Sequence, residues 1–404
     1  MLFSLFRYRP AFAAAILLCV AHCCFAATPP TSTVFRPDDP QNPAAFEHYY
    51  NLDYDAAIQD FEHILARHPN DPFAVNHLLS AIQVRELYRM GAMNTGEYSN
   101  DSFIGEAHRP ADPVQKERIK RLVAQAGKLE EAELAANPNN VDALYARGVT
   151  RGQFALYTAL IERAWFSALR NAVGARHDHE RVLELDPHYT DAKLVVGAHN
   201  YVMGSLSLAV RMAVALARLS GDKDKGLQYL TDAYRANSET SVDAGVVLMV
   251  FLRREHRYGE ALEIARTVGP RFQHNYLFPL EEGNLLRASG KNAEAEEQYR
   301  LVWQNGRQGK YGGLHYETAA LGLGDLLRSE KRYPAAAAAY ELVNEVKGAD
   351  PEVLQKANLG AGEMYDQLQQ RDLAVKKYEA VMAANAGNAE ADKARKRMKE
   401  AYRE

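Results

Sequence analysis

The chain has 404 residues, of which 47% are hydrophobic and 25% are charged, and its 48 basic and 52 acidic side chains give a formal net charge of −4. This length and apolar content are ample for a large buried core. The mixed, slightly acidic charge argues against nucleic acid as the main partner, because proteins that bind it present a basic surface to the phosphates.

The first 26 residues have the pattern of a secretory signal peptide. Arg7 and Arg9 form a basic start, residues 11–25 are apolar, and Ala26 is a small residue at the expected cleavage position. We therefore predict export, most simply to a bacterial periplasm, with cleavage after Ala26. The alternative is an uncleaved membrane anchor, for which the apolar run is short.

The mature protein is expected to have no cysteine, because all three cysteines lie at positions 19, 23 and 24. This excludes a disulfide, a thiolate nucleophile and a Cys-ligated metal. A stretch rich in Pro and Thr follows the signal peptide, and we predict a flexible linker at 27–43.

A helical pattern repeats along the rest of the sequence. Gly324 is followed three residues later by Leu327, twelve later by Ala336 and sixteen later by Tyr340. The segments that start at Gly283 and Gly362 have an alanine and a tyrosine at the last two of these offsets. In a further segment Met249 takes the place of the glycine and is followed at the three offsets by Leu252, Ala261 and Ala265.

This spacing resembles the tetratricopeptide repeat, a helix pair of about 34 residues with a small residue in its first helix and an alanine and an aromatic residue in its second. The resemblance covers about Phe46 to Ala384. It implies an all-α fold over 44–404, a right-handed superhelical solenoid of about eight stacked antiparallel helix pairs. No pair buries its apolar face alone, so neighbours must stack. The expected anchor positions of the second helices are Ala57, Ala126, Ala175, Gly226, Ala261, Ala295, Ala336 and Ala374.

Two units are longer than the family pattern, and we predict helical insertions at about 153–173 and 205–225. The first is rich in aromatic residues and is interpreted as one long helix. The second contains the apolar stretch Leu206 to Leu219. The insertions either bury extra core or dock against a partner or a membrane surface, and the sequence leaves both interpretations open.

The run HDHE at 177–180, with His188 nearby, has residue types that bind metals. On a helix only residues three or four apart share a face, so His177 can join Glu180 but no third ligand. Two ligands do not make a closed site. His179 occupies the aromatic position of its repeat and is interpreted as a packed core histidine, and we predict neither a metal nor a cofactor.

Motifs for nucleotide binding or for hydrolysis do not occur in the sequence. His315 and Glu317, in a glycine-rich loop, form a weak acid/base pair with nothing to orient it. We therefore predict that the protein is not an enzyme.

The predicted binding site lies on the first helices, since the resemblance implies that their side chains face a groove. The residue four after the small residue is arginine in three consecutive repeats, Arg253, Arg287 and Arg328, and Asn284 lies one turn before Arg287. A row of guanidinium groups suits the carboxylates of an acidic peptide or of the C-terminus of a partner protein. The alternative is that these are ordinary surface arginines.

These observations predict an exported scaffold that mediates protein–protein interactions in the cell envelope, without catalysis. One alternative is a protein associated with peptidoglycan or another carbohydrate, which would need two carboxylates at a catalytic separation if it were hydrolytic. The other is a membrane-peripheral protein held through Leu206–Leu219.

Overall fold

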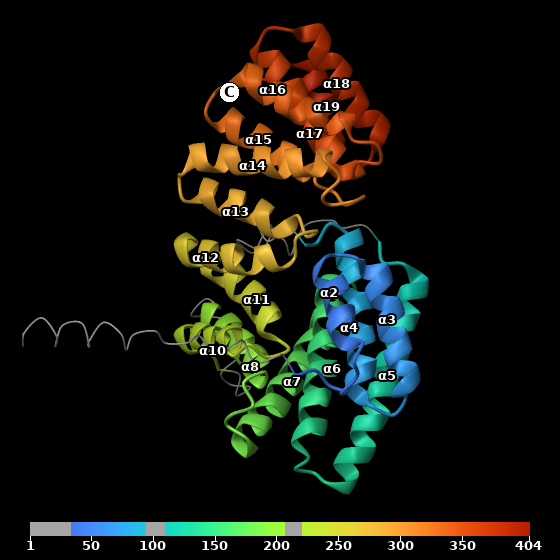
Figure 1. Cartoon of the computed structure of the whole chain (residues 1–404). Coiled ribbons are helices and arrows are strands. Elements are labelled where there is room, and N and C mark those ends of the chain that lie inside the picture. The colour runs from blue at the N-terminus through green and yellow to red at the C-terminus, as the bar shows by residue number, and fades with distance from the viewer. Residues whose placement is uncertain (1–33, 94–109, 207–219) are drawn as a thin grey trace, which may run out of the picture. The chain divides into compact units, whose positions relative to one another are not determined.

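The computed structural model describes residues 34–93, 110–206 and 220–404, and all regular structure within these ranges is helical (Figure 1). The predicted signal peptide and most of the stretch Leu206–Leu219 lie outside them. No helix in the described ranges is long and apolar enough to cross a bilayer. The helices are α2 (Asn42–Tyr50), α3 (Tyr54–Arg67), α4 (Pro72–Arg89), α5 (Pro113–Ala136), α6 (Val141–Leu160), α7 (Trp165–Leu185), α8 (Ala192–Ser205), α10 (Lys223–Arg235), α11 (Ser241–Arg254), α12 (Tyr258–Val268), η3 (Gly269–Arg271), α13 (Leu277–Ala288), α14 (Asn292–Arg307), α15 (Thr318–Ser329), α16 (Tyr333–Leu342), η4 (Val343–Glu345), α17 (Pro351–Gln367), α18 (Arg371–Ala384) and α19 (Ala389–Lys399).

Three of the helices begin with the same local signal, an aspartate followed by proline. Asp71, Asp112 and Asp350 each accept a hydrogen bond from the backbone N–H two residues further on, and each precedes a proline that opens the helix. Proline suits this position because its missing N–H would have no partner in the first turn and its φ is already helical.

Consecutive helices pack against each other in antiparallel pairs, and each pair packs on the next. In the described ranges the pairs are α2–α3, α4–α5, α6–α7, α8–α10, α11–α12, α13–α14, α15–α16 and α17–α18, after which α19 packs on α18. The eight predicted anchor positions all fall in second helices, and the seven alanines among them are fully buried. The predicted all-α stack of helix pairs is confirmed.

The packing of Tyr340 shows why the motif requires glycine. This tyrosine lies on α16, and a Cβ added to Gly324 of α15 or to Gly360 of α17 would lie closer than 3.0 Å to its ring. Its hydroxyl donates to Asp325 Oδ1 at 2.7 Å. The aromatic ring therefore fills the space between two first helices, and a larger residue at either glycine would occupy the same space.

The first predicted insertion has a different structure from the one expected. Residues 153–173 do not form one helix, because α6 ends at Leu160 and α7 begins at Trp165, and Arg163 in the turn between them has a φ of 54°. The additional residues instead lengthen both helices of the α6–α7 pair, which remain packed on each other. Both helices have the same apolar periodicity, and the turn between them has only four residues. The sequence pattern therefore looks like that of one uninterrupted helix.

The predicted flexible linker at 27–43 extends too far along the sequence. The Phe35 ring stacks on Phe46 with centroids 4.7 Å apart, and α2 begins at Asn42. Asp39 is buried, and its carboxylate accepts two hydrogen bonds from Arg67, at 2.8 Å each. The Arg67 guanidinium holds the pKa of Asp39 well below its usual range. Residues 35–41 are thus anchored to the first helix pair.

Contacts also join the first helices of the protein to helices far along the sequence. Tyr50 donates to Asp243 Oδ2 at 3.3 Å, and its ring lies 5.0 Å from that of Phe272. His77 Nε2 lies 2.7 Å from Glu239 Oε1. The stack is therefore not restricted to contacts between neighbouring repeats, because α2 and α4 also touch the region of α10 to α13.

Candidate functional site

The three predicted arginines lie in the consecutive first helices α11, α13 and α15, and each faces a carboxylate of the next first helix. Arg253 contacts both oxygens of Glu281, at 2.8 and 2.9 Å, and its side chain is only 13% exposed. Arg287 Nη1 lies 3.9 Å from an oxygen of Asp325 and is 37% exposed. These contacts form a series of ion pairs that links one repeat to the next.

Arg328 continues the same arrangement at the C-terminal end. Its guanidinium lies 2.7 Å from Glu363 Oε2, donates to the Tyr402 hydroxyl at 2.8 Å and stacks over the Tyr402 ring at 5.0 Å. Asn284 has an internal role as well, because it donates to Glu281 Oε2 at 3.2 Å and accepts from the Tyr299 hydroxyl at 2.7 Å.

The three predicted arginines thus already contact carboxylates of the protein itself. Glu281 and Glu363 are buried, and a buried carboxylate needs a paired and hydrogen-bonded cation. An acidic partner at Arg253 or Arg328 would have to compete with these internal carboxylates. Binding of an acidic segment at these positions stays a prediction, with Arg287 the most exposed of the three arginines.

The prediction that His179 is a packed core residue is confirmed, whereas His177 in the same run is exposed. The ring of His179 lies against Gly148, its Nδ1 donates to the carbonyl oxygen of Ala175 at 2.8 Å, and burial lowers its pKa to about 4. The neighbouring Asp178 is ion-paired with two arginines of α6, Arg147 and Arg151. In the part of the protein that the structure describes, no group of three or more His, Cys, Asp or Glu side chains is placed to hold a metal.

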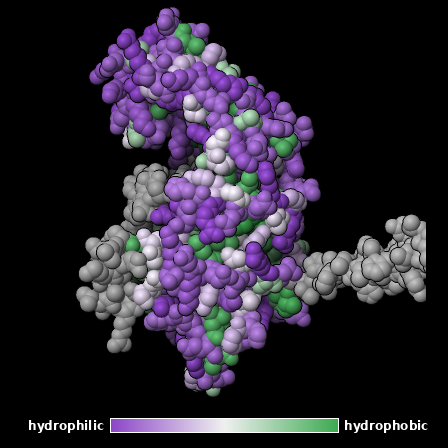
Figure 2. Space-filling model, turned by 90° about the vertical axis from the view of Figure 1, so that its left-hand side faces the viewer, coloured by the Kyte–Doolittle hydropathy of each residue, from purple (hydrophilic) through white to green (hydrophobic). Residues whose placement is uncertain are grey.

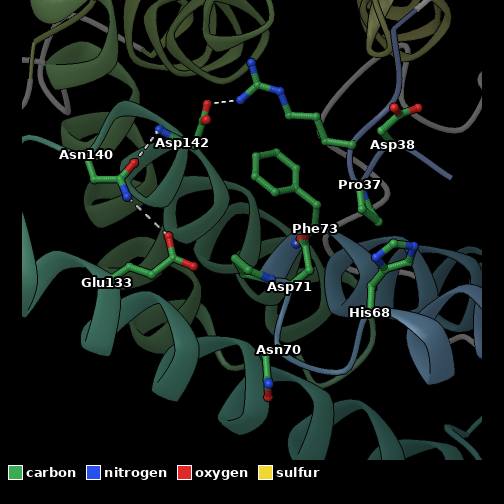
Figure 3. Close-up of a pocket in the computed structure, with 11 residues that line it drawn as sticks. Pro37, Asp38, His68, Asn70, Asp71, Phe73, Glu133, Asn140 and Asp142 are labelled. Atoms are coloured by element: carbon green, nitrogen blue, oxygen red, sulfur yellow. Dashed lines mark hydrogen bonds and ion pairs between the residues drawn. The ribbon is translucent and has the colours of Figure 1, made fainter.

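A hollow of about 550 Å³ lies where the segment before α2 meets the starts of α4 and α6 (Figure 3). Its walls carry four carboxylates, from Asp38, Asp71, Glu133 and Asp142. Burial and the nearby charge of Asp71 raise the pKa of Glu133. The basic side chain of Arg36 pairs with Asp142 and contributes to the wall of the hollow.

The polar groups of this hollow are largely committed to structure. Asp71 caps α4, and Asn140 caps α6 by accepting from the N–H groups of Asp142 and Ala143 while donating to Glu133 Oε2 (Figure 3). Arg36 also lies over the Phe73 ring, at 5.6 Å. The arrangement supplies a negative, partly aromatic recess that can bind a basic group, and it holds no nucleophile beside a base.

Apolar side chains are exposed at the α6–α7 turn, within the first predicted insertion, for which the sequence left both burial and docking open. Phe166 is 93% exposed, Leu156 44% and Leu169 40%. Leu156 lies one turn before the end of α6 and Leu169 one turn after the start of α7, so the antiparallel pair brings all three to one end. The face shown in Figure 2 is mainly hydrophilic, with apolar side chains in small separate groups. A nearly fully exposed phenylalanine at the same end of the helix pair as two exposed leucines is a candidate contact surface.

No family model matches the chain, and no curated protein sequence matches it. The solved structures that are similar to it include pilF of Pseudomonas aeruginosa, 17% identical over 62% of this chain and 97% of its own, with a TM-score of 0.37. The Cut9–Hcn1 hetero-tetramer of APC/C is 14% identical over 90% of this chain and 56% of its own, with a TM-score of 0.45. The human IFIT1 dimer with m7Gppp-AAAA is 12% identical over 89% and 82%, with a TM-score of 0.40.

Similarities this distant carry no argument about a partner or a site. The fold rests instead on the packed helix pairs of the protein itself, with alanine anchors and with tyrosines between glycines. The chain is a helical solenoid built from stacked antiparallel helix pairs.

Proposed function

We propose that the protein is an exported scaffold of the cell envelope that binds a protein partner and performs no chemical step. The observation that carries this proposal is the exposed apolar surface of Leu156, Phe166 and Leu169 at the end of the α6–α7 pair. Burying apolar area against a partner stabilises a complex, and aromatic side chains at the centre of an interface contribute most of the binding energy.

Two further features support this role. The N-terminal 26 residues have the pattern of a secretory signal, which supports export. In the hollow of Figure 3, Asp71 caps α4 and Asp142 pairs with Arg36, and two arginines of the first helices, Arg253 and Arg328, are held in ion pairs. These commitments support recognition over acid–base catalysis. Because the charge is mixed, we propose a protein partner and not a nucleic acid.

The test is site-specific photocrosslinking in the native cell envelope, followed by mass spectrometry. A photoreactive phenylalanine analogue at position 166 is expected to crosslink one protein in a defined ratio. The same analogue at Leu301 of α14, which is also an exposed apolar position, serves as the control. An identical set of crosslinked proteins from both positions would contradict the proposal, and crosslinking of position 166 to lipid alone would favour a membrane-peripheral role.

A further inference from the structure

The segment that follows α19 crosses the last repeats as an extended peptide. α19 ends at Lys399, the backbone of Glu400 is extended, and residues 401–404 have no regular secondary structure. They run back towards the preceding repeats, and the chain end marked C in Figure 1 lies beside α15 and α16. The contacts of these residues therefore show how this surface holds an extended peptide.

Tyr402 makes most of these contacts. The guanidinium carbons of Arg328 and Arg397 lie 5.0 and 4.4 Å from the centroid of its ring, and Arg328 also donates to its hydroxyl at 2.8 Å. Its backbone N–H donates to Asp366 Oδ2 at 2.8 Å, and its carbonyl oxygen accepts from Gln367 Nε2 at 3.5 Å. The surface thus contacts the ring, the hydroxyl and both backbone groups of one tyrosine, which is how a peptide-binding site recognises a residue.

The groups that hold Tyr402 are themselves fixed by contacts that do not involve it. Glu363 bridges the two arginines, since its Oε2 lies 2.7 Å from the first and its Oε1 3.2 Å from the second. The side chain of Asp366 is fully buried, and Arg371 pairs with it at 2.8 Å. The site therefore keeps its shape when residues 401–404 leave it, and a ligand does not have to rebuild it.

The segment that occupies the site is itself mostly exposed. Tyr402 is only partly buried, and Arg403 and Glu404 are exposed. Because Tyr402 follows the end of α19 by three residues, the short tether keeps it at the site at an effective concentration of about a millimolar or more. A second peptide of the same chemistry has to compete with this internal occupant.

We propose that this site binds an extended segment of a protein partner that carries a tyrosine, and that residues 401–404 occupy the site until the partner displaces them. Tyrosine fits better than phenylalanine, because its hydroxyl accepts from Arg328. An acidic residue two positions further along fits as well, because Tyr333 donates to Glu404 at 2.9 Å in the present occupant. The inference goes beyond the proposed function, which depends on the α6–α7 surface, and adds a second contact on the last repeats.

The test is a fluorescence anisotropy titration of the mature protein with the labelled peptide EAYRE, which has the sequence of residues 400–404. Tyr402→Ala removes the internal competitor. We expect this variant to bind the peptide roughly tenfold or more tightly than the wild type does. The matched peptide EAARE lacks the tyrosine and should bind the variant roughly tenfold or more weakly than EAYRE does. Equal affinity of EAYRE for the wild type and Tyr402→Ala, including no binding to either, would overturn the inference, and so would equal affinity of the two peptides.

Further variants separate the site from a general effect on the fold. Tyr229→Ala removes a ring that lies against two lysines on another repeat, and it should bind EAYRE as weakly as the wild type does. In the Tyr402→Ala background, Arg397→Gln should weaken binding about fivefold or more, whereas the exposed Arg395→Gln on the same helix should change it less than about twofold. Undiminished binding to the Arg397→Gln variant would place the peptide elsewhere and overturn the inference. If Tyr402→Ala fails to fold, Tyr402→Leu is the second variant, because it keeps an apolar side chain and lacks the ring and the hydroxyl.

The outcome is separable from that of the proposed function. The peptide requires only the site on the last repeats, whereas photocrosslinking at position 166 requires only the α6–α7 surface. Crosslinking of a partner without binding of the peptide would remove this inference and leave the scaffold role in place.

Discussion

Replacing Gly324 by alanine tests whether the tyrosine–glycine packing holds the repeats together. The new Cβ would lie 2.9 Å from Cγ of Tyr340 and closer still to other atoms of the ring. The ring cannot move away freely, because a Cβ built on Gly360 would also lie within 3.0 Å of its other edge and its hydroxyl is bound to Asp325. The substitution therefore forces two helices apart or breaks that hydrogen bond.

The expected change in stability follows from three contributions. Overpacking costs about 1–3 kcal/mol, and loss of the hydrogen bond between Tyr340 and Asp325 costs about 1 kcal/mol. The higher helix propensity of alanine offsets about 1 kcal/mol. We expect Gly324→Ala to lower the free energy of unfolding by about 1–3 kcal/mol, the balance of these terms.

Gly259→Ala is the matched control, because this glycine is also helical and an added Cβ meets nothing within 4 Å. We expect it to be neutral or to stabilise by up to about 1 kcal/mol. Urea unfolding measures both changes, and hydrogen exchange locates them. For Gly324→Ala, exchange should rise in α15 to α17 and change little in α3. Equal stability of the two variants would refute the packing argument, and a uniform rise in exchange along the sequence would refute the repeat-by-repeat stack.

Three further predictions address charge and export. Arg253→Gln should lower the free energy of unfolding by about 3–5 kcal/mol, because it leaves the buried carboxylate of Glu281 without its ion-pair partner. Arg287→Gln removes a more exposed ion pair and should cost less than about 1 kcal/mol in the same urea unfolding assay. Burial raises the pKa of Asp243 to about 7, whereas an aspartate in the unfolded state has a pKa of about 4. The contribution of this group to the free energy of unfolding is therefore fully present below about pH 4 and is lost as the pH rises through 7. Asp243→Asn should therefore gain stability relative to the wild type between about pH 5 and pH 8, and a constant difference in melting temperature would contradict this. N-terminal sequencing of the exported protein should begin at Ala27 or within a residue or two, whereas intact Met1 in the soluble cytosol would contradict export.

The fold was predictable because each repeat carries its own local signal. Ala295 and Tyr299 are four residues apart on one helix face, and both are fully buried as that spacing predicts. The same reasoning identified His179 as a packed residue, since it takes the position that Tyr299 has in its repeat. These predictions require only the period of a helix and the size of the side chains.

The partners of the arginines were not predictable in the same way. Arg253 and Glu281 are 28 residues apart, and the contact depends on how one repeat is rotated on the next. Glu130 is a similar case, because it takes an aromatic position, is buried, and accepts from the Thr150 hydroxyl. Burial raises its pKa to about 7. The sequence does show that a charged residue occupies a position that is normally buried. It does not show which hydrogen-bond donor contacts that residue.

The contact of Tyr50 with Asp243 had no local signal at all. These residues are 193 positions apart, and a repeat pattern predicts contacts between neighbours only. The sequence also left open whether the insertion at 153–173 is buried or docks a partner, because the number of helices in this stretch decides which apolar side chains are covered. A single helix and a helical hairpin have the same composition and different exposed faces.

The most direct test of the scaffold role is a calorimetric titration of the mature protein with the partner identified by crosslinking. A variant with Phe166→Ser and Leu169→Ser removes the apolar contact surface, and one with Leu301→Ser and Leu373→Ser removes two exposed leucines elsewhere. The first variant is expected to lose roughly tenfold or more in affinity, because central apolar anchors contribute most of the binding energy. The second should bind like the wild type. Equal affinity of both variants for the partner would contradict binding through the α6–α7 pair.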